Sequence, residues 1–193
     1  MIASQLSLED IQQMTLEVGE AWAVTHAVRL MELIHQIGGE ITYDEQVLQL
    51  AANLHDWGAF PKYAQKGVEH ALRSRQVVEA EILLRLDLSP EQKVILLEAI
   101  EFHDFRDMRP TVSNEALLLR EADMLEFLGA MGMAREFARG ARDMAGSYQR
   151  IFSRRAVIQN RFTLPRAREM ARIRFAHMDQ YLRWLDEESF GAL

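Results

Sequence analysis

Cysteine is absent from the 193-residue sequence, and proline occurs only four times. Without cysteine the chain can form neither a disulfide nor a zinc–thiolate site, so any bound metal must be held by nitrogen and oxygen ligands. No stretch approaches the ~18 apolar residues of a membrane-spanning helix, and the first residues lack the basic-then-apolar pattern of a secretion signal. We therefore expect a cytoplasmic protein with no membrane partner.

Basic residues are also in the minority, because 22 lysines and arginines are set against 29 aspartates and glutamates, for a net charge of −7. A general nucleic-acid binder neutralises phosphates with a basic surface, so we expect no nucleic-acid partner. A small phosphorylated substrate remains compatible with this balance, since it needs only a local basic patch and a cation. The apolar content of 49% and the chain length are typical of one globular domain.

Apolar residues recur at helical spacing, and we find no convincing strand pattern. The four prolines mark boundaries between segments. Leu8, Ile11, Met14 (or Thr15), Val18 and Trp22 recur at three- and four-residue steps, which is the pattern of one buried helical face. A helix carrying His26 then runs to about Ile37 and stops at Gly38-Gly39. Further helices are expected from a capping box at Thr42 to about His55, from about His70, from Ser89 to His103, from Ser113 through Asp123, and, as a long amphipathic helix, from Pro165 to about Glu188.

The last of these helices is expected to turn Ile173, Ala176, Leu182 and Leu185 inward and its arginines toward water. The segment between Gly129 and Gly146 is less regular and reads as short helices and turns. The sequence thus predicts an all-α fold, a single compact helical bundle over residues 1–193. We place its core at about residues 20–135 and a C-terminal helical extension at about 136–193.

The adjacent pair His55 and Asp56 is informative because His26 precedes it and Asp123 follows it, each in an apolar, helix-like stretch. Two imidazoles and two carboxylates are a suitable ligand set for a divalent metal. A buried imidazole or carboxylate needs a partner, since leaving it without one costs several kcal/mol. Any one of the four is more often a hydrogen-bonded core residue, but the four in this order favour convergence on one metal.

Two further histidines, His70 and His103, stand at predicted helix ends. A histidine near a helix C-terminus can simply complement the helix dipole. Alternatively, the two could bind a second metal, contact substrate phosphate or protonate a leaving oxygen. His35 falls on the helix face opposite His26, and together with His177 it is expected to be structural or solvated.

Three basic residues are candidates for contacts with substrate phosphate. Arg29 shares a helical face with His26, because the two are three residues apart. Lys62 lies in the loop after Asp56, and Arg106 follows His103 into its loop. The ordinary interpretation of each is a solvated surface charge.

The pattern of His26, His55-Asp56 and Asp123 on helices resembles the HD-domain superfamily of metal-dependent phosphohydrolases. It is closest to the small bacterial HD hydrolases that include a nucleoside-triphosphate pyrophosphohydrolase, over about residues 20 to 188. The matching segments are Leu54-His55-Asp56 with Pro61-Lys62, Ala99 to His103, Ala122 to Arg135, which is the most specific, and Leu164-Pro165.

The chain departs from that branch in three places. Met124 stands where an arginine is usual, Asp104 stands where a serine is usual, and His70 is an extra histidine that resembles those of two-metal HD enzymes. Ala59-Phe60 replaces the Glu-Asp pair of HD enzymes that act on guanosine tetraphosphate, which argues against that activity. The departures leave substrate and metal number open.

The resemblance implies an enzyme that hydrolyses a phosphoester or phosphoanhydride of a small molecule, with a nucleotide as the expected substrate. His26, His55, Asp56 and Asp123 would hold a divalent cation (Mn, Fe, Mg or Ni), and His70 with His103 would serve a second one. Asp56 would orient the nucleophilic water or bridge the two ions. The alternatives are a degenerate HD domain that binds a nucleotide or protein, and a helical interaction protein that uses its C-terminal helix. A homo-oligomer is left open.

Overall fold

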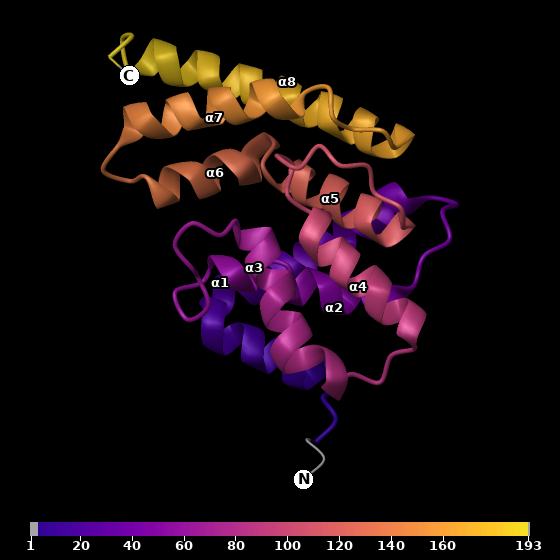
Figure 1. The fold of residues 1–193 in the computed structure, drawn as a ribbon. Coiled ribbons are helices and arrows are strands. Elements are labelled where there is room, and N and C mark those ends of the chain that lie inside the picture. Colours follow the sequence, from indigo (N-terminus) through magenta and orange to yellow (C-terminus); the bar gives the residue numbers. More distant parts are fainter. Residues whose placement is uncertain (1–3, 193) are drawn as a thin grey trace. The chain divides into compact units, whose positions relative to one another are not determined.

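The computed structural model describes residues 4–192, and these residues are mainly helical (Figure 1). The elements are α1 (Leu8–Gly38), α2 (Glu45–Leu54), η1 (Trp57–Ala59), α3 (His70–Val77), η2 (Val78–Ile82), η3 (Leu83–Arg85), α4 (Pro90–Phe102), α5 (Asn114–Glu126), α6 (Gly129–Arg139), α7 (Met144–Ile158) and α8 (Pro165–Glu188). The described residues contain no strand, only an isolated bridge between Leu6 and Leu86. The predicted all-α class is confirmed.

Within residues 4–192, no helix combines the length and the apolar character needed to cross a bilayer.

The chain divides into two compact units, Met1–Arg120 and Glu121–Leu193. The division falls inside α5, so one continuous helix runs from the first unit into the second. The organisation as one domain, with a core at about 20–135 and an extension at about 136–193, stays a prediction.

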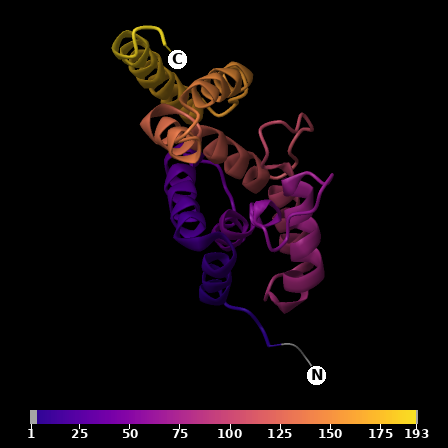
Figure 2. The ribbon, with the colours of Figure 1, turned by 90° about the vertical axis from the view of Figure 1, so that its left-hand side faces the viewer.

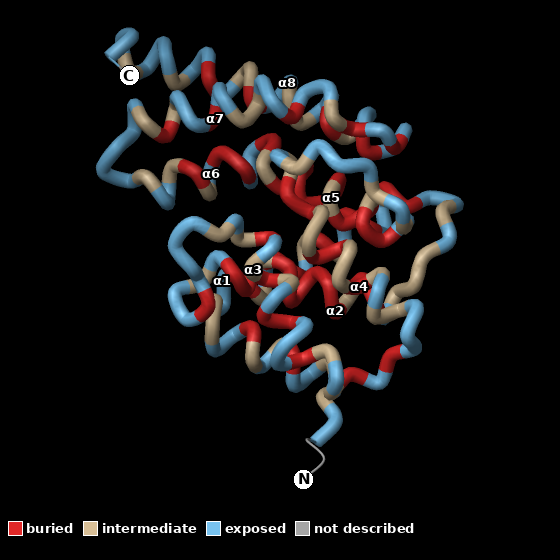
Figure 3. The backbone as a smooth tube through the Cα atoms, viewed as in Figure 1, coloured by how far each residue is buried: buried red, intermediate tan, exposed pale blue. Residues whose placement is uncertain are grey.

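In the first unit, α2 packs against both α1 and α4, and α3 packs against α4 and η1. Figure 2 shows the indigo helix α1 and the magenta segment with α3 and α4 on opposite sides of this unit. The short helix α2 is buried along nearly its whole length, including Leu48 and Leu54 (Figure 3). Its C-terminal end is therefore held firmly by its neighbours, and this end leads directly into His55.

Helix starts in the first unit follow capping chemistry. At α4, the side chain of Ser89 accepts the backbone N–H of Gln92 and the Gln92 side chain accepts that of Ser89, which is the predicted capping box. At α2 the predicted cap at Thr42 is wrong. Asp44 is the N-cap, and its carboxylate accepts the N–H of Val47. Both residues can cap a helix, and the folded backbone places Asp44 where its side chain meets the first N–H groups.

Helix α1 is interrupted close to His26. Glu20 has a φ of 57° and a ψ of −171°, so the helical path breaks there and resumes toward His26. A side chain at Gly19 would place its Cβ 2.5 Å from the ring of Phe60. Helix α1 and the loop after His55 are therefore in close contact at Gly19, where the absence of a side chain leaves room for the ring of Phe60.

In the second unit, α6 packs against both α7 and α8. Helix α8 has the predicted bounds, and it buries Ala167, Ala171, Met178 and Leu182. The predicted inward positions of Ile173 and Ala176 are wrong, because both are exposed. The residues that α8 buries recur at four- and seven-residue steps. This row is displaced around the helix from the one that the hydrophobicity of the sequence predicts.

Candidate metal centre

Buried Trp57 holds the loop that carries His55 and Asp56 in place. The indole N–H of Trp57 donates to the hydroxyl of Thr15 at 3.0 Å. The Thr15 hydroxyl in turn donates to the carbonyl oxygen of Asn53 at 3.2 Å. Since these three residues are buried, the chain of hydrogen bonds ties the end of α2, the loop and α1 together.

Gly58 fixes the same loop against the start of α3. Its N–H donates to the hydroxyl of Ser74 at 2.8 Å, and that hydroxyl donates to the carbonyl oxygen of His70 at 3.0 Å. A Cβ on Gly58 would lie 2.3 Å from the same carbonyl oxygen. This close approach brings His70 next to the His55-Asp56 pair although the residues are far apart in the sequence.

The Asp56 carboxylate lies among four imidazoles, and its two oxygens face different pairs. Oδ2 is 3.5 Å from Nε2 of His55 and 4.0 Å from Nε2 of His26. Oδ1 is 3.4 Å from Nε2 of His70 and 3.7 Å from Nε2 of His103. A carboxylate placed in this way can bind one cation through each oxygen, so Asp56 has the position of a bridging ligand.

Backbone carbonyls set the orientation of two of these rings. Nδ1 of His55 is 2.9 Å from the carbonyl oxygen of Ala52, and Nδ1 of His103 is 2.7 Å from that of Ile100. A carbonyl oxygen only accepts, so each Nδ1 carries a hydrogen and each neutral ring presents its Nε2 lone pair to Asp56. Such a hydrogen bond from the other ring nitrogen is the usual support of a metal-binding histidine.

Nε2 of His55 is buried and makes no hydrogen bond within the described residues. A buried acceptor without a hydrogen bond is costly unless a cation binds it. His55, Asp56 and His103 each bring a ligand atom within 4.8 Å of the other two. The nitrogen and oxygen donors therefore fit a divalent metal such as Mn²⁺ or Fe²⁺.

His70 links this cluster to a second group of charged side chains. Its Nε2 is 3.1 Å from Nε2 of His103, and its Nδ1 is 3.5 Å from Oδ2 of Asp104 and 3.3 Å from a terminal nitrogen of Arg106. Arg106 can only donate, so Nδ1 of His70 accepts in this contact. Asp104 binds Arg106 through both carboxylate oxygens, so it also holds the guanidinium beside His70.

Ionisation in the cluster follows from these contacts. Burial raises the pKa of Asp56, but the positive charges that His55 and His103 carry when protonated outweigh it and bring the pKa well below its ordinary value. Burial and repulsion by His103 lower the pKa of His70, against the opposing charges of Asp56 and Asp104. A carboxylate that stays ionised beside a neutral imidazole is the state that metal binding requires.

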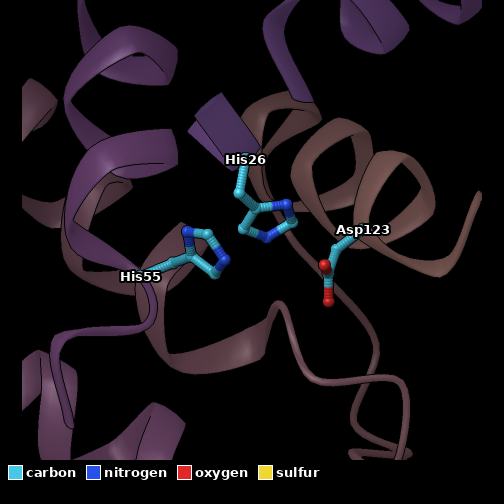
Figure 4. Close-up of side chains that lie close together, drawn as sticks. All are labelled: His26, His55 and Asp123. Atoms are coloured by element: carbon cyan, nitrogen blue, oxygen red, sulfur yellow. The ribbon is translucent and has the colours of Figure 1, made fainter. Parts of the chain in front are cut away.

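Figure 4 draws the side chains of His26, His55 and Asp123. The rings of His26 and His55 are tilted toward each other, with centroids 5.2 Å apart. Asp123 is buried on α5, within one turn after Arg120, the last residue of the first unit. Its role as the fourth ligand stays a prediction.

The three basic candidates occupy different positions. Arg106 is the one placed at the histidine cluster, against His70. Lys62 is exposed in the turn after η1, and its ammonium lies 4.9 Å above the ring of Tyr63. Arg29 is half-buried on α1, one turn after His26. Their contacts with substrate stay predictions.

The other two histidines are exposed, as expected. Nε2 of His35 is 2.9 Å from a carboxylate oxygen of Glu45, and His177 lies on α8.

Sequence reasoning missed two residues beside the cluster. Asp104 was noted only as a departure from serine, although its spacing of two residues from Arg106 is typical of a side chain that closes a tight turn. The apolar spacing from Leu8 to Trp22 predicts that Trp22 lies on the buried face of its helix, but 40% of the residue is exposed. Its distance of four residues from His26 was the available signal, because residues so spaced are neighbours on a helix.

Comparisons with known proteins agree with the fold. The HD domain family model matches residues 23–128. The structure of YpgQ from Bacillus subtilis in complex with ADP is 23% identical, with a TM-score of 0.69 over 94% of this chain and 97% of that chain. A predicted HD superfamily hydrolase from an uncultured Thermotogales bacterium is also 23% identical, with a TM-score of 0.63 over 93% of this chain and 90% of that one.

An HD-superfamily hydrolase from Bacillus thuringiensis is 18% identical, with a TM-score of 0.65 over 94% of this chain and 96% of that one. No curated protein sequence matches the chain.

Proposed function

The chain belongs to the HD domain family, and from this premise we propose that it is a metal-dependent phosphohydrolase that acts on a small nucleotide. The observation that carries the proposal is the Asp56 carboxylate, whose two oxygens face two different pairs of histidines. A helical interaction protein would not need four imidazoles around one carboxylate, because burying these groups is costly without a bound cation.

We assign His26, His55, Asp56 and Asp123 to a first divalent cation, and His70 and His103 to a second cation that shares Asp56. A bound divalent metal lowers the pKa of a water ligand and polarises a phosphoryl oxygen, which are the two effects that phosphate hydrolysis needs most. The identity of the metal is part of the test below, with Mn²⁺, Fe²⁺, Mg²⁺ and Ni²⁺ as candidates.

The protein's own residues supply positioning and charge. Asp56 remains ionised because of the imidazoles around it, so it can orient a water molecule or hold it as a hydrogen-bond acceptor. Arg106, held by Asp104, brings a positive charge to the edge of the cluster. Lys62 and Arg29 are proposed to offset further phosphate charge, since guanidinium and ammonium groups form strong hydrogen bonds with phosphate oxygens.

A nucleotide substrate is supported by the likeness to YpgQ, a protein of the same fold whose structure was determined with ADP. The net charge of −7 is consistent with a small substrate rather than a polynucleotide. The chain has Ala59-Phe60 in place of an acidic pair, so guanosine tetraphosphate is not the substrate we propose.

The test is a nucleotide panel assayed for released phosphate and pyrophosphate with each candidate metal. We expect turnover of at least one nucleotide in the presence of metal, no turnover with chelator, and loss of turnover in Asp56→Ala. His35→Ala is the matched control, because His35 is exposed and outside the cluster. Metal-dependent turnover that persists in Asp56→Ala would contradict the assignment.

A further inference from the structure

An exposed aromatic side chain lies directly beside the metal centre. The indole of Trp22 stacks on the imidazole of His26, with ring centroids 5.1 Å apart and an angle of 22° between the rings. The ring of Phe60 meets Trp22 edge-on, at a centroid distance of 6.4 Å and an angle of 81°. Although Trp22 makes both contacts, 40% of the residue is accessible to solvent.

Local backbone features fix both rings. Trp22 comes two residues after Glu20, whose positive φ of 57° interrupts α1. Phe60 lies in the loop after the His55-Asp56 pair, and its ring fills the space that a side chain at Gly19 would occupy. A non-glycine residue with positive φ costs free energy, and such strain is commonly retained at ligand-binding sites. The break thus places an aromatic pair where the metal-binding elements meet.

Hydrolysis of a phosphate requires charge and a metal, but no aromatic surface. A tryptophan that only shielded His26 would gain most by being fully buried, because its apolar area is large. A partly exposed tryptophan next to the proposed metal centre instead offers a flat surface on which a heterocycle can stack. Stacking on an aromatic side chain tolerates different bases, since every base has a π face.

We propose that Trp22, with Phe60 at its edge, is the surface on which the nucleobase of the substrate stacks while its phosphates reach the metal centre. The inference rests on the proposed function, and it adds that the protein distinguishes a nucleotide from a base-free polyphosphate. Trp22 is a binding residue in this proposal, and the hydrolysis itself depends on the metal cluster.

The experiment compares a nucleoside triphosphate with inorganic tripolyphosphate as substrates of the metal-loaded full chain. We expect Trp22→Ala to lower kcat/KM for the nucleotide by roughly 5- to 150-fold, from the effect of removing one stacking partner. The kcat/KM for tripolyphosphate and the bound metal should change little. Trp22→Phe should retain part of the preference, and Trp184→Ala, an exposed tryptophan on α8, should retain all of it.

A binding measurement keeps this inference separate from the hydrolytic activity. Calorimetric titration gives the dissociation constants of a non-hydrolysable nucleotide and of tripolyphosphate. Comparing the two constants measures recognition of the base, even in a protein that turns over neither substrate. Weaker nucleotide binding in Trp22→Ala, with tripolyphosphate binding unchanged, supports the stacking surface whether or not turnover is seen. Equal losses for both ligands would mean that Trp22 only supports His26, and no loss for either would mean that the base does not contact it; each result overturns the proposal.

Discussion

Replacing Asp56 by asparagine removes one negative charge from the cluster while nearly keeping the volume of the side chain. The carboxylate lies 3.4 to 4.0 Å from four imidazole nitrogens, so its charge is central to any cation bound there. Two unit charges about 4 Å apart interact by about 4 kcal/mol at an effective dielectric constant of ~20. If only half of this is lost on substitution, about 2 kcal/mol, the metal binds about 30-fold more weakly.

This weakening can be read as a shift in thermal stability. A metal present at 100 times its dissociation constant stabilises the folded protein by about 2.7 kcal/mol. A 30-fold weaker site at the same metal concentration gives about 0.9 kcal/mol. For a chain of this length we expect the metal to raise Tm by about 5–10 °C in the wild type and by about 2–4 °C in Asp56→Asn.

The assay is differential scanning calorimetry with and without Mn²⁺, with His177→Gln as the control because His177 is exposed on α8. The control should show the full wild-type shift. If Asp56→Asn gains as much from the metal as the wild type does, the carboxylate is not a ligand and the reasoning fails.

Three further predictions concern the cluster and the second unit. His103→Gln removes the ring 3.1 Å from Nε2 of His70 and should leave at most one metal ion per chain by mass spectrometry, whereas two ions would contradict the second site. Gly58→Ala forces a Cβ to 2.3 Å from the His70 carbonyl oxygen and should lower the free energy of unfolding, measured in urea, by about 1–3 kcal/mol. An unchanged urea midpoint of unfolding would show that this steric conflict does not exist. In Glu136, burial raises the pKa but Arg150 and Arg154 bring it below the ordinary 4.5, so this carboxylate stabilises the fold above that pH. The stability difference from Glu136→Gln, about 1–3 kcal/mol at pH 7, should therefore shrink as the pH falls below about 4.5, and a constant difference down to pH 3 would refute it.

The sequence predicted the helices well where local chemistry determines their ends. The capping box at Ser89 and the helix stop at Gly39 are both present. Each of these two features depends only on residues within one helical turn of itself. The cap of α2 was misplaced from Asp44 to Thr42, since both residues can cap a helix and only the folded backbone decides between them. The buried face of α8 was misplaced because hydrophobicity does not say where the neighbouring helices lie.

The sequence indicated which residues form the histidine cluster, but not how they are arranged around Asp56. The sequence indicated His70 and His103 as open candidates, and the structure brings both to Oδ1 of Asp56. Their approach depends on Gly58 and Ser74, a long-range packing contact that no local pattern reveals. Trp22 was misjudged for a related reason, since the break at Glu20 changes which face of α1 is covered.

The most direct test of the central claim is a crystal structure of the Mn²⁺-loaded protein, with anomalous scattering used to locate the metal. The account predicts a metal peak bound by Nε2 of His55 and a carboxylate oxygen of Asp56, and a second peak on the His70 and His103 side of the same carboxylate. Manganese found only at sites away from Asp56, with the four imidazoles binding no metal, would contradict it.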